Sequence, residues 1–193
     1  MNSSRHFPRL QRRENYSAYN RYSEYRSEIR EDCQERCVYC DMHEFACGGI
    51  QGMQIDHFKP KNHFPELEHD PCNLVWSCAP CNRLKWHSWP PIDFPDEVDG
   101  RRAFLDPFDV DRNHYFEIIP DDGSLIARQD PAQYMIERLQ LNRDLLRFMR
   151  RKRDVFDKFV EFLDGIVEKS GDVADKKHWV AIRALIDELF VPY

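Results

Sequence analysis

Four cysteines occur as two closely spaced pairs, Cys37-x-x-Cys40 and Cys78-x-x-Cys81, with 37 residues between the pairs. A C-x-x-C turn presents two thiolates to one ion, and two such turns complete a closed tetrahedral site. Zinc suits four soft sulfur ligands and has no redox chemistry of its own. The spacing therefore predicts a structural zinc site, which would hold together the chain segment between the two pairs.

The alternatives to a metal site are a redox-active dithiol or ordinary buried cysteines. All seven cysteines lie between residues 33 and 81. The first residues show no apolar stretch after their basic side chains, so we expect no secretory signal, which favours metal or redox chemistry over disulfides. Two pairs in one short window favour the metal. We expect the remaining Cys33, Cys47 and Cys72 to be small buried apolar residues.

Polar residues suited to hydrolysis lie between and just after the cysteine pairs. Asp56 and Asn82 offer hard oxygen ligands for an ion such as Mg²⁺. His57 can accept a proton from water near neutral pH. One base and one divalent cation can together supply the nucleophile and the charge neutralisation that phosphodiester hydrolysis needs. We therefore interpret this segment as a candidate catalytic site.

The chain around these residues predicts two strands followed by a helix. Residues 53–58 alternate in polarity, residues 73–76 form a second strand, and a helix over 82–89 is stopped by Pro90-Pro91. On this interpretation the polar residues converge at the start of the helix.

Outside this segment the pattern predicts mainly helices. We expect a flexible arm over 1–20, a helix over 21–36 and an extended connector over 90–112. Residues 115–119 and 125–127 predict a β-hairpin, because Asp122-Gly123 favours a tight turn. Helices are expected over 131–142, 143–168 and about 175–190. The apolar positions expected in the core of the long helix are Leu145, Leu146, Met149, Phe156, Phe159, Val160 and Leu163.

The order C-x-x-C, D-H-x-x-P, N-L and C-x-x-C-N-x-x-K resembles the HNH endonucleases with a ββα-metal fold and a structural zinc. It stands here as Cys37 and Cys40, then Asp56 to Pro60, Asn73-Leu74, and Cys78 to Lys85. The arrangement is similar to phage endonuclease VII-type resolvases and to HNH proteins of bacterial antiphage systems, such as the Septu and retron-associated nucleases. The resemblance covers about 50 of 193 residues.

The resemblance implies a role for each matching residue. His57 would be the general base, and Asp56 and Asn82 would hold a catalytic Mg²⁺ or Mn²⁺. Asn73 would brace the loop that orients His57. The third motif position is asparagine, where many members have histidine. Adjacent strand residues point to opposite faces, so Asp56 and His57 can share a site only where the strand is distorted or ends.

Two groups of basic residues are candidates for contact with a nucleic-acid backbone. Lys59, Lys61, Arg83 and Lys85 flank the motif, whereas Arg143, Arg147 and Arg150 recur on one helical face. The alternative for both groups is a solvated surface. We expect Phe148, Phe156 and Phe159 to belong to the core rather than to stack on bases.

Composition limits the class of protein more than its activity. The formal net charge is −6, and residues 86–130 carry 11 acidic against 4 basic residues, so we expect any basic surface to lie towards the two ends of the chain. No apolar run is long enough to span a membrane, and we expect a cytoplasmic protein. We expect an α+β fold in three parts. These are an N-terminal arm and helix (1–30), an HNH core with zinc knuckles (31–92), and a connector, β-hairpin and helical region (93–193).

The leading hypothesis is a metal-dependent endonuclease that acts on nucleic acid, DNA before RNA. The competing hypothesis is a zinc-stapled module that binds nucleic acid or protein without cutting. Such a module has no need of Asp56, His57 and Asn82 together. The resemblance further implies a nuclease subunit of an antiphage system, whose partner is an ATPase or another copy of the chain.

Overall fold

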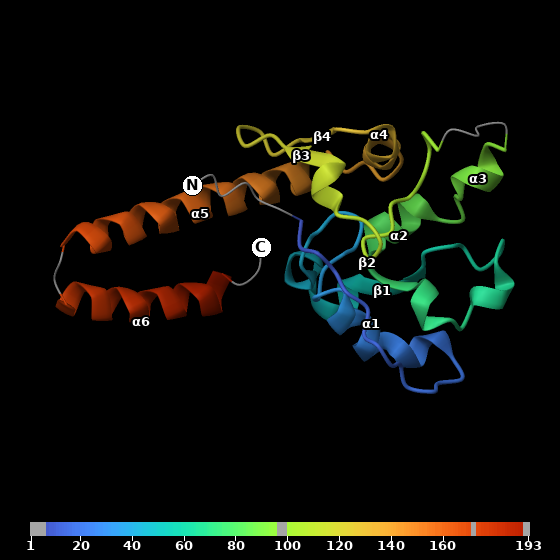
Figure 1. The fold of residues 1–193 in the computed structure, drawn as a ribbon, viewed down its shortest axis with the longest axis horizontal. Helices are drawn as coiled ribbons and strands as arrows, with labels where there is room; N and C mark the ends of the chain where they lie inside the picture. The colour runs from blue at the N-terminus through green and yellow to red at the C-terminus, as the bar shows by residue number, and fades with distance from the viewer. Residues whose placement is uncertain (1–6, 96–99, 171–172, 191–193) are drawn as a thin grey trace.

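The structure is a computed structural model that describes residues 7–95, 100–170 and 173–190. It confirms the predicted α+β class, with small sheets beside helices (Figure 1). The helices are α1 (Arg26–Asp32), α2 (Ala79–Lys85), α3 (Pro90–Asp93), α4 (Asp130–Arg138), α5 (Asp144–Ser170) and α6 (Val173–Phe190). The strands are β1 (Met53–His57), β2 (Leu74–Cys78), β3 (Phe116–Ile118) and β4 (Leu125–Ala127). Within the described ranges, no helix combines the length and the apolar character that crossing a bilayer requires.

Strands β1 and β2 form the expected antiparallel pair, with Met53 opposite Cys78 and His57 opposite Leu74. Every residue of β2 is buried, because α1 packs against it and α2 continues directly from its end. Pro80 lies in the first turn of α2, where its missing N–H leaves no helical bond unmade. The predicted ββα unit is therefore confirmed.

Helix α2 differs from the predicted helix over 82–89. It begins three residues earlier, at Ala79, and it ends at Lys85 rather than at Trp89. Trp86 has a φ of 50°, outside the helical region, so the backbone turns away before the two prolines are reached. The earlier start places Cys78 and Cys81 at the junction between strand and helix.

The predicted helix over 21–36 is shorter in the structure. A one-turn 3₁₀ segment (Tyr22–Tyr25) leads into α1, which ends at Asp32. Gln34 and Glu35 have φ values of 53° and 59°, and two successive left-handed residues stop a helix.

The prediction of a flexible arm over 1–20 is wrong for the part that the structure describes. Phe7 and Leu10 are buried, and the ring of Phe7 packs on that of Phe116. The side chain of Arg13 donates to the carboxylates of Asp32 and Glu31. Residues 7–13 therefore form an ordered segment that packs on the body of the protein, the part of the chain that precedes α5 (Asp144–Ser170). Residues 1–6 lie outside the described residues.

The C-terminal third contains the predicted hairpin and three predicted helices. β3 pairs antiparallel with β4, and α4 contacts β4. Within the predicted connector, the described residues 90–95 and 100–112 contain the single turn α3 and the start of a 3₁₀ turn (Arg112–His114). Figure 1 shows α5 and α6 side by side and antiparallel, projecting from the body as a pair.

The long helix buries fewer of the predicted core positions than expected. Leu146, Met149 and Val160 are buried, but Leu145 and Phe159 are exposed. Phe148 is also exposed, contrary to the prediction. The reason is that α5 contacts the body only near its own start, and along the rest of its length it contacts α6. One side of α5 therefore stays exposed.

The hairpin turn touches α5 so closely that only glycine fits at position 123. Gly123 has a φ of 71°, and a Cβ there would collide with the backbone carbonyl of Arg147. Gly100 has a similar φ of 69° but open space around it.

We expect Gly123→Ala to lower the free energy of unfolding by about 2–4 kcal/mol, because the cost of a left-handed alanine adds to that of overpacking. Gly100→Ala should cost only about 1–2 kcal/mol, since it carries the backbone cost alone. Urea unfolding of the two variants measures the difference. Equal losses would show that the hairpin does not dock on α5 in solution.

Candidate active site and metal centre

The two cysteine pairs meet at one point inside the protein. Their four Sγ atoms all lie within 4.8 Å of one another, and each residue is buried. Cys37 and Cys40 lie on a tight turn after α1, in which the Asp41 N–H donates to the carbonyl of Cys37. Cys78 ends β2 and Cys81 lies in the first turn of α2.

The sulfur geometry fits a tetrahedral zinc ion. With Zn–S bonds of about 2.3 Å, neighbouring sulfurs should be about 3.8 Å apart. The Sγ atoms of Cys40 and Cys78 are 3.8 Å apart. Four thiols that converge within 4.8 Å, with no other type of metal-binding side chain grouped with them among the described residues, are the donor set of a structural zinc rather than of a hard cation.

Arg143 closes the cysteine cluster from the side of α5. One Nη atom lies 3.4 Å from Sγ of Cys81 and 3.9 Å from Sγ of Cys78. Four thiolates around one Zn²⁺ carry a net charge of −2, so a guanidinium at this distance offsets part of it.

The face of α5 that carries Arg143, Arg147 and Arg150 is therefore engaged by the protein itself, and of these three residues Arg147 remains partly exposed. Arg150 is buried and donates to the carbonyls of Gly123 and Leu141. Arg147 forms an ion pair with Asp122, 2.6 Å between nitrogen and oxygen. The spacing that placed Arg143, Arg147 and Arg150 on one face was correct, but that face packs on the body and ties α5 to it.

The remaining cysteines differ from one another. Cys33 is buried as expected, accepts the backbone N–H of Trp76, and has a pKa that burial raises to about 12. Cys47 is half-buried. Cys72 is exposed, so its prediction as a buried residue is wrong. It lies on a one-turn segment (Pro71–Asn73) at the surface.

A cleft of about 430 Å³ opens beside the ββα unit. Asp56 and His57 reach it from the end of β1, and Asn82 reaches it from α2. The other residues that line it are Gln54, Ile55, Pro60, Lys61, Ala79, Arg83, Trp86 and His87. The structure thus brings together three of the four predicted catalytic residues, and the fourth, Asn73, lies behind the cleft wall.

His57 is held by its Nε2 atom, which lies 2.9 Å from the carbonyl oxygen of Glu68. A carbonyl only accepts, so the neutral ring carries its proton on Nε2 and its lone pair on Nδ1. Its ring meets that of Tyr22 edge-on, with centroids 4.8 Å apart. Burial lowers the pKa of His57 below its ordinary value of 6.5, which favours the neutral, proton-accepting form at pH 7.

Asp56 lines the cleft, but its carboxylate also makes contacts in the interior. Its Oδ2 accepts the hydroxyl of Tyr39 at 2.6 Å and lies 3.2 Å from Nζ of Lys85. Burial raises the pKa of Asp56 and lowers that of Lys85, and each charge partly offsets the effect on the other. His57, the next residue along β1, makes different contacts, with the Glu68 carbonyl and the ring of Tyr22, although both residues line the cleft.

Lys85 was expected to touch phosphate, and this prediction is wrong. Its side chain is completely buried, and its ammonium donates to the His57 carbonyl at 2.8 Å as well as contacting Asp56. A signal was available in the sequence. Lys85 comes four residues after Cys81, so both residues face the same side of α2. Lys59, Lys61 and Arg83, in contrast, are exposed at or near the cleft.

Asn73 and Asn82 make different contacts. The Asn73 side chain accepts the backbone N–H of Lys59 at 2.8 Å and donates to its carbonyl at 3.0 Å, which ties the start of the loop after β1 to the start of β2. The amide nitrogen of Asn82 donates to the side-chain oxygen of Gln54 at 2.7 Å. That bond leaves the carbonyl oxygen of Asn82 as its potential metal ligand.

The cysteine cluster predicts about one zinc ion per chain in freshly purified protein, measured by elemental analysis. Cys78→Ser should lose the ion and melt at a much lower temperature, because metal-binding energy is folding energy. Cys72→Ser, at an exposed position, should keep both the zinc and the melting temperature. Folded protein without zinc would contradict the assignment.

The buried Lys85–Asp56 pair gives a second prediction. Lys85→Met should lower the free energy of unfolding by about 3–5 kcal/mol, because it leaves a buried carboxylate without its cation. The double variant Lys85→Met/Asp56→Asn should recover part of the loss. Lys61→Met, which removes an exposed partner of Glu68, should change stability little. A small effect of Lys85→Met in urea unfolding would show that Asp56 is neutral in the folded protein.

Comparison with known families agrees with the geometry. Residues 37–88, about a quarter of the 193 residues, match the family model of the HNH endonuclease. The match begins at the first cysteine pair and ends just beyond α2. No curated protein matches the chain. The segment 37–88 therefore matches the HNH endonuclease family, and it is built as a ββα unit around four cysteines that fit a zinc ion.

Proposed function

We propose that this chain is a metal-dependent endonuclease that hydrolyses phosphodiester bonds, with His57 as the general base. The observation that carries the proposal is the state of His57 at the wall of the cleft. Its Nε2 is engaged by the Glu68 carbonyl, its pKa is lowered, and its Nδ1 is left as the basic nitrogen. A water molecule beside that nitrogen would lose its proton as it attacks phosphorus.

The loop after β1 positions this base. The Phe58 N–H donates to the Asn73 carbonyl, and the Asn73 side chain makes two bonds to the backbone of Lys59. Lys85 holds the carbonyl of His57 itself. We assign Asn73 and Lys85 as positioning residues, because they bond to the backbone of His57 and of the two residues that follow it, and neither lines the cleft.

The oxygen donors of the cleft fit a weakly held divalent ion. One carboxylate, Asp56, and one amide oxygen, Asn82, would hold Mg²⁺ or Mn²⁺, with water and substrate phosphate completing its ligands. When bound, such an ion neutralises charge on the phosphate and stabilises the leaving oxygen. Because Lys85 already neutralises much of Asp56, we expect the ion to bind weakly without substrate.

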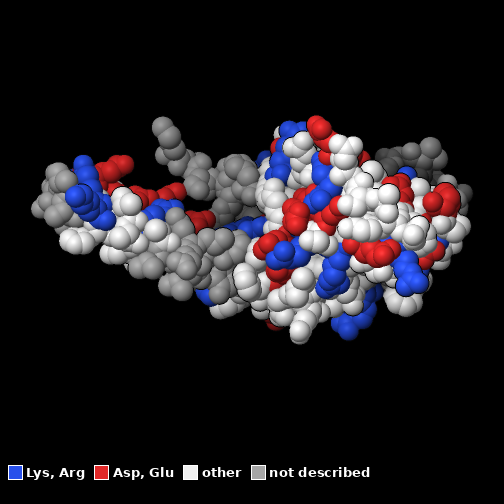
Figure 2. All heavy atoms as spheres, turned by 90° about the horizontal axis from the view of Figure 1, so that it is seen from below, with Lys and Arg blue, Asp and Glu red and all other residues white. Residues whose placement is uncertain are grey.

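The substrate is expected to be nucleic acid, and DNA before RNA. Exposed Lys61 and Arg83 at the cleft, and Lys59 beside it, can contact phosphates. On the face seen in Figure 2, basic and acidic side chains alternate rather than separate, so the basic contacts would be local to the cleft. A role as the nuclease subunit of an antiphage system, beside an ATPase partner, rests on the family resemblance alone.

Nicking of supercoiled plasmid with Mg²⁺ or Mn²⁺ tests the proposal. His57→Ala should lose about 10²–10⁴-fold in rate while keeping its zinc, its melting temperature and its affinity for DNA. His178→Ala, the same substitution on an exposed position of α6, should cut normally. Asn82→Ala should be partly restored by excess Mn²⁺, because its defect lies in metal binding.

Asn73→Ala should show an intermediate loss of rate, because it acts through the position of His57. An unchanged rate for His57→Ala would overturn the assignment of the base. If the parent cuts neither DNA nor RNA, alone or with lysate of its source, the binding module without cleavage becomes the better hypothesis.

A further inference from the structure

Helix α5 carries a row of large apolar side chains that project into solvent. A soluble chain seldom leaves so many large apolar residues in one row unless a partner covers them. The exposed fractions are Leu145 56%, Phe148 63%, Val155 63%, Phe159 52%, Phe162 64% and Ile166 48%.

These residues follow a heptad repeat. Their spacings are alternately three and four residues, once Lys152 and Lys169 are included at the two positions that the apolar residues skip. Such a repeat keeps one seam of a helix against another helix, as in a coiled coil. The row therefore has the pattern of a helix–helix interface over about seven turns.

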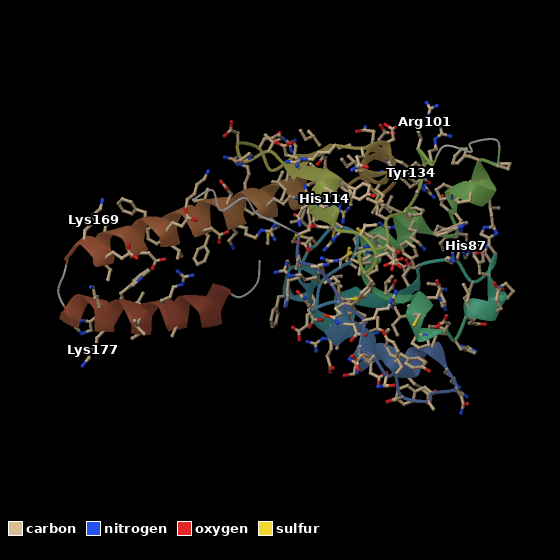
Figure 3. The ribbon with its side chains drawn as sticks, viewed as in Figure 1. His87, Arg101, His114, Tyr134, Lys169 and Lys177 are labelled. Atoms are coloured by element: carbon tan, nitrogen blue, oxygen red, sulfur yellow. The ribbon has the colours of Figure 1, made fainter. Side chains whose placement is uncertain are left out.

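Helix α6 does not cover this seam. It packs on another side of α5, where Val160 is buried and Asp164 accepts the indole N–H of Trp179 at 2.6 Å. Arg183 of α6 also donates to Asp164, at 3.0 Å. Figure 3 shows Lys169 and Lys177 at the tip of the α5–α6 pair, away from the body, so the seam runs along a projecting element that a partner can reach.

We propose that the seam of α5 pairs with the same seam of a second copy of this chain, antiparallel, about a twofold axis at Asp157. In that register each position i faces position 314 − i of the partner copy, so every seam residue meets another seam residue. Phe148 faces Ile166, and Val155 faces Phe159, each pair occurring twice.

The two lysines favour this orientation over a parallel one. In a parallel pair Lys152 would face its own copy, which places like charges together in the seam. In the antiparallel pair Lys152 faces Phe162, and Lys169 faces Leu145. A lysine can lay its methylene stem along an apolar partner and keep its ammonium in water.

The area is sufficient for a stable dimer. The five apolar residues that are more than half exposed would bury on the order of 100 Å² apiece. Two copies then bury about 1,000 Å² from these residues alone, near the lower bound of a specific interface, and their neighbours add to it.

The register places the two nuclease bodies at opposite ends of the paired helices, about 36 Å of helix apart. The dimer is independent of the proposed nuclease activity.

Sedimentation of the full chain at tens of micromolar tests the dimer. The parent should have the mass of two copies. Val155→Glu and Phe159→Glu should each raise the dissociation constant by about 100-fold or more, because each places two carboxylates in the central layers. Phe45→Glu, at a residue that is 71% exposed elsewhere on the body, should leave the dimer intact. Zinc content and helix content by circular dichroism confirm that each variant folds.

Cross-linking tests the orientation, in a background of Cys47→Ser and Cys72→Ser. Phe148→Cys and Ile166→Cys should each give little linked dimer alone and should link efficiently when the two variants are mixed. Self-linking of Phe148→Cys would show a parallel pair and overturn the register. A monomeric parent, or a dimer unaffected by Val155→Glu and Phe159→Glu, would overturn the proposal and leave the seam to a different protein.

Discussion

The meeting of four thiols from two distant turns is the constraint on which the other parts of this structure depend. The Cys37–Cys40 turn and the Cys78–Cys81 corner are separated by 37 residues, and those residues contain β1, the loop after it and β2. Joining the two corners at one point fixes where β2 ends and where α2 begins. It thereby fixes the helix from which Asn82 and Lys85 extend towards β1.

A second layer of charge surrounds this cluster and connects it to the rest of the chain. Arg143 lies against two of the sulfurs, and Asp41, next to Cys40, accepts from Arg112 of the connector and Arg153 of α5. Each of these arginines comes from a segment far away in sequence. The centre of negative charge therefore organises the C-terminal region as well as the HNH domain, because every buried carboxylate or thiolate needs a cation nearby.

Asp56 and His57, the last two residues of β1, differ in the same way, because only the carboxylate is paired with a cation. Both residues line the cleft, but the carboxylate of Asp56 contacts Lys85 and Tyr39 in the interior, whereas the imidazole of His57 contacts the carbonyl of Glu68. The proposed base, His57, is held by a backbone contact rather than by an acidic side chain, since its Nε2 donates to the carbonyl of Glu68. His57 is thus a partly buried histidine whose Nε2 is bound by the Glu68 carbonyl and whose Nδ1 is the basic nitrogen.

The sequence by itself determined the features that depend on local spacing. C-x-x-C turns, the alternation in β1, the Asp-Gly hairpin and the helical periodicity of α5 each depend on residues within one or two turns of chain, and these predictions agree with the structure. Which face of α5 would meet the body was not a local property. Arg143 packs inward because it contacts the sulfur of Cys81, and Arg150 because it donates to the carbonyl of Gly123. Phe148 and Phe159 lie on the exposed side of the helix. Likewise only the tertiary structure decided that Lys85 serves Asp56 rather than phosphate, since its partner lies 29 residues away in sequence. In both cases the deciding interaction joins residues far apart in sequence, Arg143 with Cys81 and Lys85 with Asp56.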